Sequence, residues 1–114
     1  MKYAQSDIVE VVFPLPNGQF KRHPAIIISN RDVYETEEIY YCIMLSTKNT
    51  NDEFIFEITP SMVNYQTDKV SYAKCQLIAQ FASNEIMMRF GSLKSESFRK
   101  LLLKLNQSVF SFVF

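Results

Sequence analysis

The chain has 114 residues, which suffices for one domain and leaves no room for a second hydrophobic core. A hydrophobic content of 47% with 21% charged residues excludes a disordered polypeptide. Twelve basic residues balance twelve acidic ones, so the chain lacks the overall positive field of a protein that coats nucleic acid. Attraction to nucleic acid would have to come from a local basic patch.

Several other classes are also excluded. The first residues lack the apolar core and cleavage site of a signal peptide, and no apolar run approaches the roughly 18 residues that span a membrane. One histidine and two scattered cysteines make a metal site unexpected. Cys42 and Cys75 are expected to be buried, reduced thiols, with a disulfide between them left open. We therefore predict a cytoplasmic protein without a membrane segment, metal or cofactor, forming a single domain over residues 1–114.

The first half of the chain predicts antiparallel strands separated by turns. Asp7–Phe13 alternates and is β-branched, and Asn17-Gly18 then favours a tight reversal. Ala25–Ser29 is a continuous apolar strand, expected to be central and buried. The inward face of the first strand would carry Val9, Val11 and Phe13.

Three more strands follow. Arg31–Glu37 is polar and is interpreted as a loop before a strand at Glu38–Ser46. Lys48–Asp52 is a turn, Glu53–Ile58 alternates as the next strand, and Val70–Ile78 supplies a fifth. Strands at this spacing predict a small antiparallel barrel, closed or partly closed.

The C-terminal quarter changes its hydrophobic period. Glu85–Arg89 is predicted as a short helix that ends at Gly91. Apolar residues then recur at three and four positions, which predicts an amphipathic helix over about residues 95–110 with Ser95 as its N-cap. The stripe consists of Phe98, Leu101, Leu102, Leu105 and Val109. The apolar last residues, SVFSFVF, have two open interpretations: packing on the domain itself, or a subunit interface.

One stretch concentrates cationic groups. Lys21, Arg22 and His23 stand between the expected turn and the buried strand, directly before Pro24. Most short basic runs are solvated hairpin edges, and that interpretation stays open here. The neighbouring apolar strand would nevertheless hold this run in a fixed position.

The order of short motifs resembles one family. D-I-V-x-V-x-F, a hairpin, K-R-x-P-A-hhh-S-N, a strand ending in Ser-Thr, S-Y-x-x-C-x-x-I and G-x-L before a terminal helix are together similar to the MazF/PemK-like toxins. The resemblance runs from about Asp7 to about Leu105. It implies an SH3-like barrel with a terminal helix, related in fold to CcdB-like toxins and usually a homodimer. It also implies a metal-independent endoribonuclease that cleaves single-stranded RNA and is blocked by an antitoxin protein.

The resemblance implies a catalytic pair, with one departure. Relatives typically carry an Arg directly before the Pro and a Thr or Ser at the end of a following strand. Here the hydroxyl falls on Ser46, with Thr47 beside it, while the position before Pro24 is His23 and Arg22 comes one residue early. Neighbours in an extended chain point to opposite sides. The catalytic candidates are therefore His23, Arg22 and Ser46, and whichever cation shares the side of Ser46 is favoured.

Metal-free RNA cleavage assigns a role to each candidate. Imidazole, with a usual pKa of about 6.5, suits acid or base chemistry at His23. The guanidinium of Arg22 suits charge stabilisation at phosphate, and Ser46 could donate a hydrogen bond to a phosphate oxygen. The alternatives are a strand-edge histidine and a hydroxyl that caps the following turn.

The remaining RNA-binding candidates are Lys21, Phe20, Thr47, Lys48 and Gln76. Phe20 could stack a base or pack in the core. Gln76 and Leu77 fall where many relatives carry Asp-Gln, and Leu77 cannot make the amide contact. The predicted function is a toxin-like endoribonuclease. The alternative is a non-catalytic relative that binds RNA or a partner protein through the same groove, and nothing in the chain favours CcdB-like binding to gyrase.

Overall fold

The computed structural model describes residues 1–113 of the chain. These residues form six strands, two α-helices and two short 3₁₀ turns. In chain order the elements are β1 (Asp7–Pro14), β2 (Phe20–Ile27), α1 (Arg31–Glu37), β3 (Ile39–Ser46), β4 (Ile55–Ile58), η1 (Pro60–Met62), β5 (Ser71–Ala82), η2 (Ser83–Glu85), β6 (Met88–Ser92) and α2 (Ser95–Ser108). The predicted mainly β fold with a C-terminal helix is confirmed.

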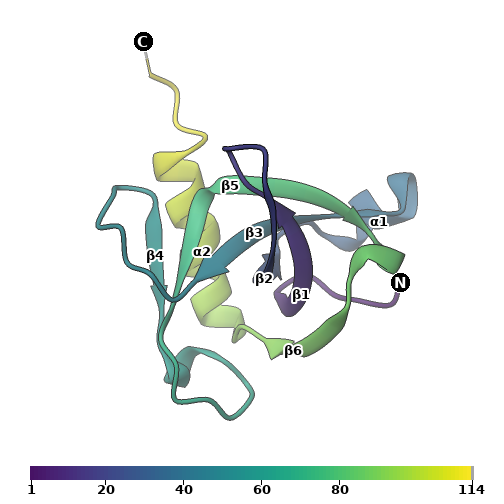
Figure 1. The fold of residues 1–114 in the computed structure, drawn as a ribbon, viewed down its shortest axis with the longest axis horizontal. Helices are drawn as coiled ribbons and strands as arrows, with labels where there is room; N and C mark the ends of the chain where they lie inside the picture. The colour runs from purple at the N-terminus through teal and green to yellow at the C-terminus, as the bar shows by residue number, and fades with distance from the viewer. Residues whose placement is uncertain (114) are drawn as a thin grey trace.

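All six strands belong to one curved antiparallel sheet, in the order β4-β5-β3-β2-β1-β6 (Figure 1). The sheet is not closed, because β4 and β6 are its two edges. The segments that follow these edge strands nevertheless meet at an isolated bridge between Val63 and Leu93. The barrel-like shape therefore comes from curvature and this single contact rather than from a continuous ring of strands.

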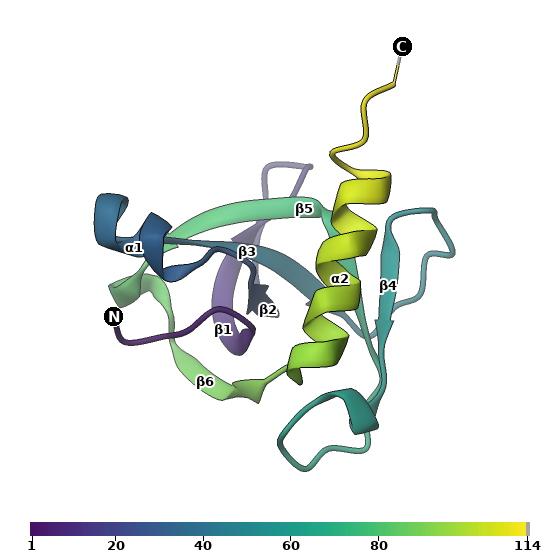
Figure 2. The ribbon, with the colours of Figure 1, turned by 180° about the vertical axis from the view of Figure 1, so that it is seen from behind.

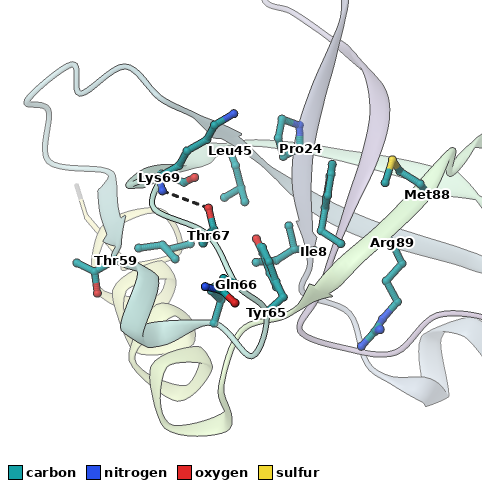
Figure 3. A pocket seen from close by; sticks show the side chains of 14 residues that line it. Ile8, Pro24, Leu45, Thr59, Tyr65, Gln66, Thr67, Lys69, Met88 and Arg89 are labelled. Carbon is teal, nitrogen blue, oxygen red and sulfur yellow. Dashed lines mark hydrogen bonds between the residues drawn. The ribbon is translucent and has the colours of Figure 1, made fainter.

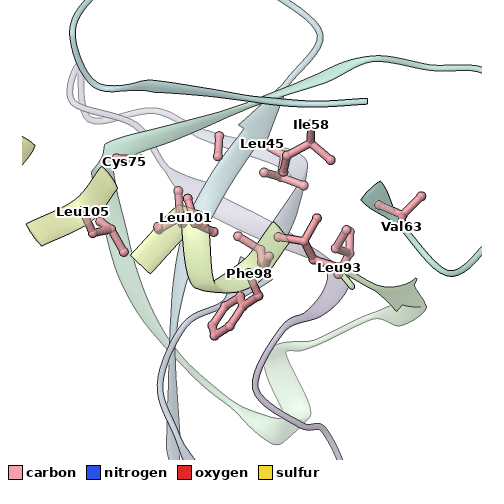
Figure 4. Packing of buried hydrophobic residues seen from close by; sticks show 12 residues of the cluster. Leu45, Ile58, Val63, Cys75, Leu93, Phe98, Leu101 and Leu105 are labelled. Carbon is pink, nitrogen blue, oxygen red and sulfur yellow. The ribbon is translucent and has the colours of Figure 1, made fainter. Parts of the chain in front are cut away.

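Helix α2 covers one face of the sheet (Figure 2). Its buried side chains are Phe98, Leu101 and Leu105, which belong to the predicted stripe. They pack on Ile8, Ile26, Ile43, Leu45, Ile58, Val63, Ala73, Cys75 and Leu93 (Figure 4). The predicted N-cap is shifted by one residue: Lys94 occupies the N-cap position without a side-chain bond, and Ser95 is the first helical residue.

The opposite face of the sheet holds a second buried cluster. Val9, Val11 and Phe13 lie in it, as predicted for the first strand. Ala25, Ile27, Tyr40, Cys42, Met44 and Phe81 complete most of it. Because both clusters use β3, this strand is buried on both faces.

The predicted loop at Arg31–Glu37 is wrong, since this segment is helix α1. The Asn30 side chain caps it by accepting a hydrogen bond from the Val33 N–H at 3.2 Å. Glu38 ends it in the left-handed conformation, and its N–H donates to the Tyr34 carbonyl at 2.7 Å. None of its residues is buried, so the segment has no apolar stripe to reveal a helix.

The predicted short helix at Glu85–Arg89 is also wrong. A 3₁₀ turn occupies Ser83–Glu85, and strand β6 then pairs with β1, with Glu10 opposite Met88 and Val9 opposite Arg89. The free edge of β1 selects the extended form, which local sequence does not reveal. Gly91 lies inside β6 rather than ending a helix.

Two strands are longer than predicted because their neighbours extend them. β2 begins at Phe20, so the basic run is part of the strand, where it pairs with the end of β1. β5 continues to Ala82 because its last residues pair with the start of β3. The basic run is therefore held by a ladder of backbone hydrogen bonds.

The apolar tail only partly packs on the domain. Val109 lies against the cluster under α2, but Phe110, Phe112 and Val113 are 63%, 84% and 81% exposed. These three side chains are thus mostly exposed, and Phe114 lies outside the described residues. None of the helices in residues 1–113 is long and apolar enough to cross a membrane.

Both cysteines are free and buried, as expected, and they lie in the two different clusters. Burial raises the pKa of Cys42 to about 12 and that of Cys75 to about 11. Only the thiolate reacts readily with disulfide reagents. We expect both thiols to resist Ellman's reagent at pH 8 in the native protein and to react promptly in urea. Rapid labelling of the folded protein would contradict this assignment.

Candidate functional site

The pairing of β2 with β3 determines which basic side chain shares a face with Ser46. Ala25 pairs with Met44, and both belong to the cluster opposite α2. His23 lies two residues before Ala25, and Ser46 lies two residues after Met44. Strand alternation therefore places both side chains on that same face. Both side chains are half-buried. The structure therefore places the imidazole and the hydroxyl on one face of the sheet, just beyond the point where the pairing of β2 with β3 ends.

Arg22 lies on the opposite face of β2. It pairs with Val12, whereas His23 pairs with the buried Val11. The Arg22 side chain is 61% exposed, and its Nε lies 3.6 Å from Oε1 of Glu10. An exposed ion pair of this kind contributes little to stability, so the guanidinium stays available to another anion. The geometry thus separates Arg22 from Ser46.

Ser46 also anchors the turn that follows β3. Its Oγ accepts a hydrogen bond from the backbone N–H of Lys48 at 3.1 Å. The hydroxyl hydrogen remains able to donate, because this bond uses an oxygen lone pair. The Thr47 and Lys48 side chains are exposed beside it. Capping the turn and contacting a substrate oxygen are therefore compatible roles for this serine.

Lys74 is a further candidate site residue, which the sequence did not reveal. It lies on β5 opposite Met44, is only 5% exposed, and donates from Nζ to Thr50 Oγ1 at 2.8 Å. Thr50 in turn donates to Oδ2 of Asp52 at 2.6 Å. From the sequence, a lysine between the apolar Ala73 and Cys75 would be expected to point into solvent. It is enclosed in the structure because both faces of the sheet are covered there.

This chain of hydrogen bonds controls the charge of Asp52. The Thr50 hydroxyl lowers the pKa of the exposed Asp52 carboxyl below its usual value. Desolvation opposes this effect, while the backbone N–H of Phe54, the charge of Lys74 and the Gln76 side chain lower the pKa further. The network therefore ties the turn after Ser46 to the middle of β5.

Replacing Thr50 tests the network. We expect Thr50→Val to raise the pKa of Asp52 towards its usual value, because the largest stabilising contact of the carboxylate is lost. A carboxyl group whose pKa is lowered in the folded protein stabilises the fold at pH values above its usual pKa. That stabilisation is lost as the pH falls through the pKa of the folded state. Carboxyl-carbon NMR titration measures the shift. Thr36→Val, which removes a hydroxyl on α1, should leave the Asp52 titration unchanged, and an unchanged titration in Thr50→Val would contradict the network.

The other predicted residues surround this end of the strands. Phe20 is 69% exposed at the start of β2, so packing in the core is wrong for this side chain. Lys21 is exposed and alternates to the same face as His23. Gln76 is exposed on β5 and contacts Asp52. Within residues 1–113, no group of three or more His, Cys, Asp or Glu side chains could hold a metal ion.

Solved structures share this fold at low sequence identity. An endoribonuclease in complex with its cognate antitoxin from a mycobacterial species has a TM-score of 0.74 at 13% identity, over 98% of this chain and 99% of that one. MazF from Deinococcus radiodurans also has a TM-score of 0.74, at 10% identity over 96% and 97%. Mycobacterium tuberculosis toxin MazF-mt6 has a TM-score of 0.67, at 10% identity over 92% and 99%. The fold is therefore that of the MazF-like proteins.

The sequence narrows this class to a family. The pattern of the PemK-like, MazF-like toxins of type II toxin–antitoxin systems matches residues 4–109, nearly the whole chain. This protein therefore belongs to the PemK-like, MazF-like toxin family. No curated protein sequence matches it significantly.

Proposed function

We propose that this protein is a toxin-like endoribonuclease that cleaves single-stranded RNA in the cytoplasm without a metal ion. Membership of the toxin family supports the proposal, as does the shared fold with structures described as endoribonucleases. The single observation that carries it is that His23 and Ser46 lie on one face, just beyond the last paired residues of β2 and β3. Lys21 and Lys48 are exposed beside them, as a polyanionic substrate requires.

The reaction uses the RNA's own nucleophile. A base takes the proton of a 2′-hydroxyl, the 2′-oxygen attacks the adjacent phosphorus, and the bond from phosphorus to the 5′-oxygen breaks. The 5′-oxygen leaves with a proton from an acid, so the products are a 2′,3′-cyclic phosphate and a free 5′-hydroxyl. Imidazole can act at either proton transfer. His23 is the group proposed for this role.

The other groups stabilise charge on the phosphate. The Ser46 hydroxyl donates to a non-bridging oxygen while its oxygen still accepts the Lys48 N–H. Arg22, Lys21, Lys48 and Thr47 are proposed to contact neighbouring phosphates, with Phe20 and Gln76 towards the bases. Arg22 can leave its weak, exposed contact with Glu10 at little cost.

A homodimer and an antitoxin are the proposed protein partners. The exposed Phe110, Phe112 and Val113 form an apolar end that supports a subunit interface. Solved MazE–MazF complexes of Deinococcus radiodurans share the fold, which supports an antitoxin for this chain as well. Light scattering of the full chain should give a dimer mass, and Phe112→Ser with Val113→Ser should reduce it to that of a monomer.

The activity test uses purified protein and mixed single-stranded RNA in EDTA. Discrete cuts by the wild-type protein that end in cyclic phosphates support the proposal. Two variants are each compared with a matched control at an exposed position. The control for Arg22→Ala is Arg99→Ala on α2, and the control for Ser46→Ala is Ser61→Ala. Binding without cutting would favour the non-catalytic alternative, in which the loss of the family's Arg before Pro24 has removed activity. The absence of RNA binding at low salt would refute both RNA functions.

A further inference from the structure

A cavity of about 480 Å³ on the α2 side of the sheet shows which way the side chains at three strand ends face (Figure 3). Pro24 of β2, Leu45 of β3 and Ser71 of β5 all line this cavity. Successive side chains of a strand point to opposite faces of the sheet. The chain neighbours of these residues that point to the face away from α2 are His23, Ser46 and Tyr72.

Tyr72 lies beside Ser46 on the neighbouring strand β5. The two residues are partners in the β3–β5 ladder. The side chains of such partners share a face, and their Cβ atoms lie about 4.5–5.5 Å apart. Both side chains are half-buried. The phenol of Tyr72 is therefore a second group with a transferable proton that can reach a phosphate held at Ser46.

Ser46 lies between the imidazole and the phenol. In the sheet, β3 has β2 on one side and β5 on the other. His23 is on β2, two residues beyond the last pair of that strand with β3, and Tyr72 is on β5. The strands on either side of a central strand lie about 10 Å apart. Side chains from these two strands can therefore approach one phosphate from opposite sides.

Cleavage of RNA by its own 2′-hydroxyl requires such an arrangement. The attacking 2′-oxygen and the leaving 5′-oxygen lie in line, on opposite sides of the phosphorus, so the base and the acid act from opposite sides. The function proposed above assigns His23 to one of the two proton transfers and leaves the other without a group. A phenol keeps its proton at neutral pH and suits the acid, whereas an imidazole that has lost its proton suits the base.

Two neighbours of Tyr72 bear on this role. Glu57, its partner on β4, shares the face but is exposed and one strand further from Ser46. An ionised carboxylate has no proton to donate. Lys74, two residues along β5, is on the same face and is buried. Its positive charge favours the phenolate that remains when the proton has left.

We propose that Tyr72 is the general acid of the endoribonuclease reaction and that His23 is its base. The proposal rests on the proposed function and adds the second proton-transfer group. His23 takes the proton of the 2′-hydroxyl, the 2′-oxygen bonds to phosphorus, and the bond from phosphorus to the 5′-oxygen breaks. Tyr72 gives its proton to that 5′-oxygen. Transfer of a proton from the imidazolium to the phenolate, through water, then restores both groups.

The test uses RNA in which sulfur replaces the 5′-oxygen at a bond that the wild-type protein cuts. A thiolate leaves without a proton, so this substrate needs no general acid. We expect Tyr72→Phe to cut ordinary RNA about 10²- to 10⁴-fold more slowly than the wild type, and to cut the sulfur-containing RNA at nearly the wild-type rate. His23→Ala should remain slow relative to the wild type on both substrates.

Tyr41→Phe is the matched control. It removes a hydroxyl from β3, where Tyr41 alternates with Ile43 and Leu45 on the α2 face and is 39% exposed. We expect this variant to cut both substrates at the wild-type rate. Thermal unfolding confirms that each variant is folded.

The outcomes separate this proposal from the nuclease itself. Equal slowing of Tyr72→Phe on both substrates, or no slowing on ordinary RNA, would overturn the role of Tyr72 and leave the nuclease in place. Rescue of His23→Ala by sulfur, with no rescue of Tyr72→Phe, would also overturn the assignment, because it would make His23 the acid. If the wild-type protein cuts neither substrate, the endoribonuclease is refuted and the acid with it.

Discussion

We expect His23→Ala to reduce RNA cleavage by roughly 10²- to 10⁴-fold, the usual contribution of a general acid or base. The variant removes the imidazole that shares a face with Ser46, while RNA binding through the surrounding cations should change little. Cleavage of a labelled oligonucleotide at saturating enzyme measures the chemical step, and fluorescence anisotropy measures binding. The loss should therefore appear in the rate of cutting and not in affinity.

Chemical rescue separates a reactive role from a structural one. Added imidazole should restore part of the activity of His23→Ala and have no effect on Ser46→Ala, because only the first variant leaves a hole of that shape. The dependence of the rate on pH between about 5 and 8 then assigns the role, rising for a base and falling for an acid. Should Arg22→Ala abolish cutting while His23→Ala retains it, the catalytic assignment would move to the other face of β2.

The second large effect concerns the helix that completes the fold. We expect Leu101→Ala to lower the free energy of unfolding by about 2–5 kcal/mol, because this fully buried side chain fills the space between α2 and the sheet (Figure 4). Urea denaturation followed by circular dichroism gives the change. A loss this large is a substantial part of the stability of a small domain.

The same helix provides a matched control. Leu103→Ala makes the same chemical change at a position that is 56% exposed, and should alter stability by no more than about 0.5 kcal/mol. Equal losses in the two variants would show that helix propensity, rather than burial under α2, accounts for the effect. A small loss in Leu101→Ala alone would show that the cluster repacks around the gap.

Elements with a strong periodic pattern were predictable from the sequence. Residues 95–108 repeat apolar side chains at three and four positions, and the three residues buried in α2, Phe98, Leu101 and Leu105, all belong to that stripe. The alternation of Asp7–Phe13 likewise places Val9, Val11 and Phe13 in one cluster. In these segments local pattern and tertiary burial agree, so either one predicts the other.

Elements that depend on a partner were not predictable. Strand β6 at Met88–Ser92 is extended because β1 offers it an unpaired edge, although the sequence Glu85–Arg89 suggested a helix. Helix α1 depends on an Asn30 cap and carries no apolar stripe. Neither a free strand edge nor a single cap appears in the periodicity of a segment.

For the site, the sequence by itself determined the chemistry that is present: a short basic run that ends in a histidine before a proline, and a hydroxyl at a strand end. Only the tertiary structure decided which of these groups meet, because the register of β2 on β3 sends His23 to one face and Arg22 to the other. It also enclosed Lys74 and formed the cavity beside Pro24 and Leu45. The physical reason is that the burial of a side chain, and the groups that share its face of the sheet, depend on how pairs of segments pack together. A sequence pattern describes only one segment at a time.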